Sequence, residues 1–140
     1  MAEGLEVTAR FRGGFRADVE ARGHRVAVDE PAEHGGEDEG FMPTELFCAA
    51  LASCFCLAIG HVARKRSLEV PDLSVTVRSE RAGRELRYAR LVVECAASLD
   101  DATLAMLMER ARPFCWVSNT LAAGVELEYR STAMDANFRK

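Results

Sequence analysis

The sequence predicts an α+β fold in one domain that spans residues 1–140. Two groups of short segments alternate apolar and polar residues as β-strands do, one group before residue 30 and one after residue 70. Between them lies the longest apolar run of the chain, residues 43–67, whose composition is that of a buried helix. A chain of 140 residues is long enough to fold as one domain with a real core.

The first thirty residues are expected to form a three-stranded antiparallel meander. Glycines separate its alternating segments, Gly13 and Gly14 after the first and Gly23 after the second. The expected strands cover residues 5–11, 15–21 and 24–28. The next stretch, DEPAEHGGEDEG at residues 29–40, is acidic and rich in glycine. It is expected to be a solvated loop because it offers little apolar surface to bury.

Residues 43–67 are expected to form a long, buried central helix. Pro43 suits the first helical turn, and Glu45 in that turn complements the positive end of the helix dipole. Between residues 46 and 63 the only polar groups are one serine hydroxyl, the thiols and the imidazole of His61. A helix that is apolar on all sides needs cover on all sides, and one small sheet covers only one. We therefore expect a homodimer in which a second copy covers the rest of this helix.

The second half of the chain is expected to add a β-hairpin, a helix, a short helical turn and a final strand. The hairpin comprises residues 73–81 and 86–97, with its turn at residues 82–84. The following helix, residues 101–112, carries an apolar stripe, is capped by Ser98 or Asp100 and ends at Pro113. Residues 114–121 are expected to form the short helical turn, and residues 125–129 alternate as the last strand.

Composition and cysteine spacing exclude several classes of protein. The chain is 49% hydrophobic and 29% charged with a net charge of −4, which indicates neither disorder nor a nucleic-acid partner. The apolar run is rich in Ala, Ser, Cys and Gly, so we expect no membrane span. No signal peptide is seen, so a cytoplasmic location is expected. Five irregularly spaced cysteines without a CxxC pair predict neither a disulfide framework nor a metal site, and no cofactor is expected.

Two cysteines have positions that matter for chemistry. Cys54 lies in the middle of the central helix among apolar neighbours, where a cysteine is typically inert core filler. Cys115 follows Pro113 at a helix break and precedes a possible short helix, whose N–H groups could stabilise its thiolate. A small buried residue is an equally good interpretation of Cys115. Residue types alone leave both alternatives open.

Several motifs together resemble the OsmC/Ohr superfamily of osmotically inducible and organic hydroperoxide resistance proteins. The segments that carry the resemblance are GGEDEGFMPTEL, PTELFCAALASCF, DLSVTVRSER and FCWVSNTL. The chain is most similar to the broad OsmC-like branch. The resemblance implies an OsmC-like fold, a long central helix in each subunit of an intertwined homodimer, and two active sites at the dimer interface.

The resemblance also implies roles for four residues. Cys54 would be the peroxidatic thiol, which reduces a small organic hydroperoxide, and Cys115 the thiol that resolves it to a disulfide. A dithiol reductant would then restore the pair. Arg12 and Arg16 flank the Gly13-Gly14 turn, and Arg16 is chosen as the residue that would stabilise the thiolate. Glu45 would orient Arg16, although the glutamate position of the Ohr branch falls one residue earlier, on Thr44. The competing hypotheses are a non-catalytic dimer that binds a small apolar or thiol-reactive ligand, and a redox sensor.

Overall fold

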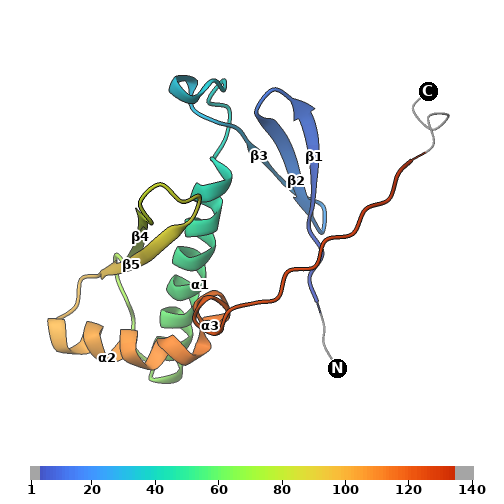
Figure 1. Ribbon diagram of the computed structural model, residues 1–140. Helices are drawn as coiled ribbons and strands as arrows, with labels where there is room; N and C mark the ends of the chain where they lie inside the picture. Colours follow the sequence, from blue (N-terminus) through green and yellow to red (C-terminus); the bar gives the residue numbers. More distant parts are fainter. Residues whose placement is uncertain (1–3, 135–140) are drawn as a thin grey trace.

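The computed structural model describes residues 4–134 and confirms the α+β class and the predicted order of elements as far as the short helix (Figure 1). In chain order the elements are β1 (Thr8–Gly13), β2 (Arg16–Ala21), β3 (His24–Val28), η1 (Ala32–His34), α1 (Pro43–Lys65), β4 (Ser74–Arg81), β5 (Tyr88–Ala96), α2 (Asp101–Ala111), η2 (Arg112–Phe114) and α3 (Trp116–Ala123).

The three N-terminal strands form the predicted meander. They pair in the order β1-β2-β3, all antiparallel, so that Val19 lies opposite Ala9 on one side and Val26 on the other. A bulge between Phe11 and Gly13 precedes the β1–β2 turn, where both glycines of the turn have positive φ. This sheet lies beside the N-terminal end of α1 (Figure 1).

The second sheet is the predicted hairpin of β4 and β5, and it packs along α1 (Figure 1). Val75 pairs with Cys95 and Val77 with Val93, which gives the hairpin one apolar face. Helices α2 and α3 pack on other parts of α1. Asp100 is the N-cap of α2, because its carboxylate accepts a hydrogen bond from the Thr103 N–H at 3.0 Å.

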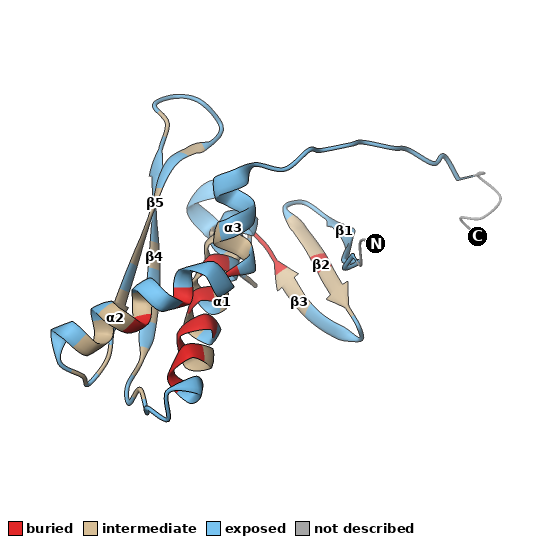
Figure 2. Ribbon diagram, turned by 90° about the horizontal axis from the view of Figure 1, so that it is seen from below, coloured by how far each residue is buried: buried red, intermediate tan, exposed pale blue. Residues whose placement is uncertain are grey.

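The core is formed by α1, α2, the second sheet and the start of α3. Its fully buried members include Ile59 of α1, Leu107 and Ala111 of α2, and Cys115. Figure 2 shows the buried residues concentrated on α1 and on the adjoining part of α2. Among the described residues, none in β1, β2 or β3 belongs to this core. The N-terminal sheet is therefore not held by the core of its own chain.

One side of α1 lacks cover within a single chain. Phe47, Ala50, Ser53 and Leu57 recur at three- and four-residue spacing and are all exposed, Leu57 by 75%. We call these four residues the uncovered stripe. By length and composition alone, α1 would also pass as a membrane span, a test that the core helix of a soluble protein passes as well.

Two sequence expectations differ from the structure. Residues 125–130 are extended and exposed, and they form no strand with the described part of the chain, although Val125, Leu127 and Tyr129 alternate as predicted. The physical reason is that a strand exists only where it pairs with another, and this segment, as it leaves α3, pairs with neither sheet (Figure 1). The acidic loop is exposed over most of its length as expected, but it also folds around the buried carboxylate of Asp29, which the sequence did not predict.

Candidate functional site

Cys54 lies in the middle of α1, where the backbone N–H and C=O groups are hydrogen-bonded to one another within the helix. The helix begins with Pro43 at its first turn, and the Glu45 carboxylate accepts a hydrogen bond from the Met42 N–H at 2.8 Å. Cys54 lies nine residues after Glu45, is half-buried and packs against the core cluster. Its neighbours along the helix include Ser53 and Leu57 of the uncovered stripe. The thiol thus lies between the core and the uncovered side of α1.

Cys115 is the N-cap residue of α3 and is fully buried. The chain breaks here because the turn η2, which contains Pro113, ends α2 and leaves Cys115 with an extended backbone. The first helical hydrogen bond of α3 then runs from the Asn119 N–H to the Cys115 carbonyl at 3.0 Å. The Ser118 hydroxyl also donates to this carbonyl, at 3.2 Å. The predicted setting of Cys115 at the start of a short helix is confirmed.

The structure brings the two predicted redox cysteines together. Cys54 packs against the buried cluster to which Cys115 belongs, where α1 and the start of α3 meet, and the Cys54 thiol is one of the groups that lower the pKa of Cys115. Both residues are present as free thiols. They are 61 positions apart in the sequence, and only the packing of α3 on α1 makes them neighbours.

The surroundings of Cys115 favour its thiolate. Burial is the largest influence and would raise the pKa of the Cys115 thiol. The side chain and N–H of Ser118, the Cys54 thiol and the Val117 N–H act on the pKa of Cys115 in the opposite direction and outweigh burial. The pKa of Cys115 therefore lies below its usual value. Backbone N–H groups at a helix N-terminus are known stabilisers of thiolates.

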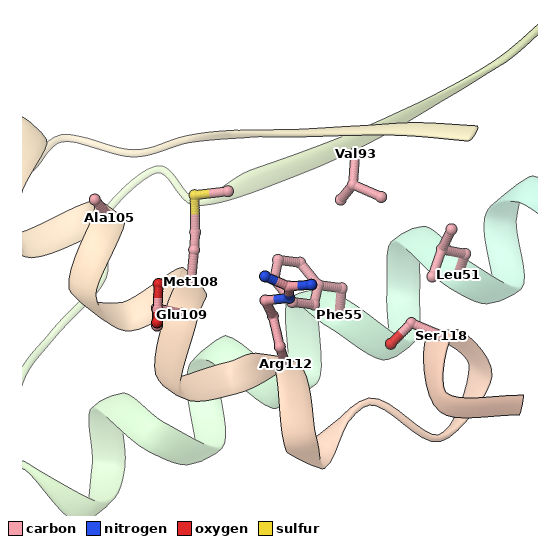
Figure 3. A pocket seen from close by; sticks show the side chains of 8 residues that line it. All are labelled: Leu51, Phe55, Val93, Ala105, Met108, Glu109, Arg112 and Ser118. Atoms are coloured by element: carbon pink, nitrogen blue, oxygen red, sulfur yellow. The ribbon is translucent and has the colours of Figure 1, made fainter. Parts of the chain in front are cut away.

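A mostly apolar cavity of about 470 Å³ is lined by Phe55, the residue after Cys54, and by Ser118, three positions after Cys115, although neither cysteine lines it (Figure 3). Leu51 and Phe55 of α1, Val93 of β5 and Met108 of α2 form its walls. Figure 3 shows that the side chains of Arg112 and Ser118 point toward the space that Phe55 also borders. Ser118 is the link between cavity and thiols, because it also hydrogen-bonds to Cys115. The size is that of a pocket for a small organic molecule.

Arg16 lies on β2 of the N-terminal sheet, which is separate from the core that holds the thiols. Its guanidinium is paired with Glu39 of the acidic loop. Its Nε is buried and has no hydrogen-bond partner among the described residues. The space around Arg16 is lined by the β1–β2 turn and by Asp29, Gly36 and Glu37 of the loop. Within one chain, therefore, Arg16 lies with the loop and not with the two cysteines.

Asp29 organises the loop that holds Arg16. The whole residue is only 2% exposed. Its carboxylate accepts hydrogen bonds from the N–H groups of Glu30, Glu37 and Glu39, at 2.8, 3.3 and 3.2 Å. At Gly36 a side chain would overlap the Glu30 carbonyl, so this tight return of the loop requires glycine. The loop that carries Glu39 to Arg16 is thus built around one buried carboxylate.

Glu45 is exposed, and its carboxylate caps the first turn of α1 by accepting the Met42 N–H. Nine residues of helix separate it from Cys54, which is about 13.5 Å along the axis. It could therefore influence the Cys54 thiol only through an intermediate group such as an arginine. The neighbouring Thr44 faces a different space, a second hollow of about 710 Å³ that shares Leu51, Val93 and Ser118 with the cavity.

Comparison with known proteins decides the family. A family model described as OsmC-like protein matches residues 36–130, which include α1, Cys54, Cys115 and the second sheet. The chain belongs to the OsmC-like protein family. The N-terminal meander lies largely outside the matched range.

Individual relatives agree with this assignment. An organic hydroperoxide resistance protein OsmC from Legionella pneumophila is 28% identical, with 86% of this chain and 90% of that chain covered and a TM-score of 0.64. An OsmC-like protein from Mycoplasma pneumoniae, 16% identical over 87% of this chain and 89% of that chain, shares the fold with a TM-score of 0.71. An uncharacterized protein of Methanocaldococcus jannaschii is 23% identical over 89% of this chain, which spans 66% of that protein's length.

The other cysteines of this OsmC-like protein have no comparable setting. Cys95 lies on β5, where burial, and then the neighbouring Cys56, raise the pKa of its thiol. Cys48 and Cys56 are half-buried on α1. Across residues 4–134, no group of three or more His, Cys, Asp or Glu side chains is placed to hold a metal ion.

Sequence reasoning missed three residues around this OsmC-like site. Ser118 and Arg112 border the cavity, and Asp29 orders the loop at Arg16. For Ser118 a signal was present, since it lies three positions after the N-cap residue, where a side chain faces the start of its helix. Arg112 gave no signal in the sequence, because a charged residue before a proline is typical of any helix end.

Proposed function

We propose that this OsmC-like protein is a thiol-dependent peroxidase that reduces organic hydroperoxides through Cys54 and Cys115. The observation that supports this most is that Cys54 packs against the buried cluster that holds Cys115, in a family with members named for organic hydroperoxide resistance. Two cysteines that serve only as filler have no need to lie close together at a helix N-terminus. The proposed role is protection against oxidative stress.

The chemistry requires two steps. The Cys54 sulfur attacks the terminal oxygen of the hydroperoxide, the O–O bond breaks, and the alcohol leaves while Cys54 becomes a sulfenic acid. The Cys115 thiolate then attacks the Cys54 sulfur and displaces hydroxide, which forms the disulfide. The two electrons that reduce the peroxide come from this pair of thiols. A dithiol reductant returns them by thiol–disulfide exchange.

The cavity beside the pair suits an organic substrate. Its walls are aliphatic and aromatic side chains, and a hydroperoxide with an apolar substituent would bury that substituent there. Arg112 and Glu109 add charge at one part of the lining (Figure 3). Hydrogen peroxide, which has no apolar part, would gain little from this pocket.

The proposal includes a homodimer. The uncovered stripe on α1, the N-terminal sheet outside the core and the exposed Val125, Leu127 and Tyr129 all leave apolar surface in contact with water. A second copy would cover the stripe and could pair with residues 125–129. Arg16 of that copy, oriented by Glu45, would then act at Cys54, because Arg16 of the same chain lies on the N-terminal sheet, apart from the core that holds the two cysteines. The cytoplasm, where thiols stay reduced, is the proposed location, with neither nucleic acid nor membrane as a partner.

Peroxide consumption tests the function. Reduced protein with excess dithiothreitol is supplied with cumene hydroperoxide, and consumption is followed for the wild type and for Cys54→Ser, Cys115→Ser and Cys48→Ser. We expect turnover with the wild type and with Cys48→Ser, a half-buried cysteine of the same helix, and its loss with Cys54→Ser. Equal consumption by Cys54→Ser would refute the peroxidase. Ligand binding without consumption would favour the binding dimer, and oxidation without turnover by any dithiol would favour a sensor.

A further inference from the structure

Arg16 is held by a carboxylate of its own chain. Its guanidinium Nη1 donates to the carboxylate of Glu39, which lies 23 positions later in the sequence. Arg16 is the first residue of β2, and Glu39 lies near the end of the acidic loop that follows β3. The ion pair therefore joins the N-terminal sheet to the loop that leads into α1.

The backbone around Glu39 is fixed on both sides. The Glu39 N–H donates to the Asp29 carboxylate at 3.2 Å, and Asp29 itself is buried. At Gly40 a β-carbon would lie 2.2 Å from the Ala27 carbonyl oxygen, so the chain passes directly against β3. One residue further, the Phe41 carbonyl accepts a hydrogen bond from the Asp29 N–H at 3.0 Å. The Glu39 side chain thus extends from a backbone that the loop holds in place.

The buried carboxylates near Arg16 have other partners. Asp18 and Asp29 both border the space around Arg16. Asp18 accepts a hydrogen bond from the Arg12 Nε at 2.7 Å, and Asp29 accepts its hydrogen bonds from backbone N–H groups of the loop. Among the described residues, the carboxylate paired with Arg16 is that of Glu39.

Glu45 occupies a different part of the single chain. It accepts the Met42 N–H and borders a hollow of about 410 Å³ between α1 and β4. That hollow shares no lining residue with the space around Arg16. In the proposed dimer Glu45 would meet the arginine of the other copy, whereas Glu39 accompanies Arg16 in its own chain.

The pairing with Glu39 leaves Arg16 with donors for a further acceptor. A guanidinium carries several N–H donors in one plane, and Glu39 binds at the Nη1. The Nε is buried and has no hydrogen-bond partner among the described residues. A carboxylate at one corner therefore sets the direction of the guanidinium plane, while other N–H groups stay available for an anion.

We propose that Glu39 is a further positioning residue of the site, which holds the Arg16 guanidinium from its own chain while Arg16 acts at Cys54. The inference rests on the proposed peroxidase function and adds an own-chain partner to the role of Glu45. The effect of Glu39 is modest, because the pair is partly exposed and such pairs contribute little. Its value lies in preorganisation, since the backbone of Glu39 is already fixed.

The order of the Arg16 side chain can be measured without peroxide. Reduced full-length protein labelled with ¹⁵N is studied by NMR, and Arg16→Lys assigns the Arg16 Nε–H signal. We expect slow exchange and a high heteronuclear NOE in the wild type, and a mobile side chain with fast exchange in Glu39→Ala. Glu37→Ala is the matched control, because it removes an equal charge from the same loop and keeps the N–H that binds Asp29. An Arg16 signal that is unchanged in Glu39→Ala would overturn the proposal.

A double-mutant cycle tests whether Glu39 acts through Arg16. The ratio kcat/KM for cumene hydroperoxide, with dithiothreitol as reductant, is measured for the wild type, Glu39→Ala, Arg16→Ala and the double variant. We expect Glu39→Ala to lower kcat/KM about two- to fivefold, the range of an exposed ion pair, and Glu39→Asp to recover part of this loss. In the Arg16→Ala background, Glu39→Ala should have no further effect. Losses that multiply in the double variant would contradict a role through Arg16.

The two measurements separate this inference from the function itself. If Arg16→Ala keeps full activity, the positioning role falls while the peroxidase function stands. If the wild type consumes no hydroperoxide, the peroxidase function fails, and the NMR comparison alone decides whether Glu39 holds Arg16. An Arg16 side chain ordered by Glu39, together with coupling in the cycle, is the result we expect.

Discussion

Leu57 offers the sharpest test of how α1 is covered. Its side chain is 75% exposed in a single chain, although it lies in the middle of the most apolar helix. In the proposed homodimer this side chain is buried against the second copy. Replacement by aspartate would leave the fold of one chain nearly unchanged, because this side chain contributes little to the core. It would, however, place a charge inside the dimer interface.

The size of the effect follows from burial. Moving a leucine side chain fully out of water is worth about 1.5–3 kcal/mol. A two-fold symmetric interface contains the residue twice, so the loss is about 3–6 kcal/mol before the added cost of a buried carboxylate. At about 1.4 kcal/mol for each factor of ten, the dissociation constant of the dimer should rise by about two to four orders of magnitude.

Sedimentation velocity over a dilution series measures this constant. We expect a wild-type dimer, a Leu57→Asp variant that dissociates at much higher concentration, and a Leu57→Met control that behaves as the wild type. Far-UV circular dichroism confirms that the variant keeps its helices. A Leu57→Asp dimer as tight as the wild type would show that this side of α1 is not the interface, and a monomeric wild type would refute the homodimer.

Three further predictions concern the fold around the site. Leu107→Ala should lower the free energy of unfolding by about 2–5 kcal/mol in urea titrations, because the side chain is fully buried between α2 and α1; a smaller loss would mean that the site collapses around the cavity. Asp29→Ala should speed hydrogen exchange of the Glu37 N–H, whose acceptor is removed, and unchanged exchange would contradict the loop's dependence on this carboxylate. The hydrogen bonds from the side chain and N–H of Thr103 lower the pKa of Asp100 in the folded protein. Asp100 therefore stabilises the fold fully above the pKa of an unfolded aspartate, about 3.9, and this stabilisation is lost as the pH falls through the lower pKa of the folded state. Asp100→Asn caps without titrating, so the stability advantage of the wild type should shrink between about pH 5 and pH 2, and a constant difference would contradict this.

Local signals in the sequence were enough to place the elements. Strand alternation and glycine turns located the meander, and β3 has the predicted bounds of residues 24–28. The apolar run located α1, which begins at Pro43 as expected and ends two residues early, at Lys65. For α2 the two possible caps were resolved in favour of Asp100, while the Ser98 hydroxyl donates to Asp72 instead. These features depend on neighbours within a few residues.

The remaining features depend on contacts between distant segments. No local pattern shows that the loop returns on Asp29, because its three donors come from residues up to ten positions away. The role of Ser118 depends on the position of α3 against α1. Residues 125–129 have the alternation of a strand, but whether they pair depends on a surface that a single chain does not provide. Arg16 was identified by resemblance, and its distance from the thiols depends on where the first sheet lies.

The central claim is that Cys54 and Cys115 form a redox pair. Its most direct test is to treat the fully reduced protein with one equivalent of cumene hydroperoxide, block the remaining thiols and map the cysteines by mass spectrometry. The account predicts a Cys54–Cys115 disulfide in the wild type and a Cys54 sulfenic acid, trapped by dimedone, in Cys115→Ser. A protein that keeps all five thiols free, or one that joins a different pair of cysteines, would contradict it.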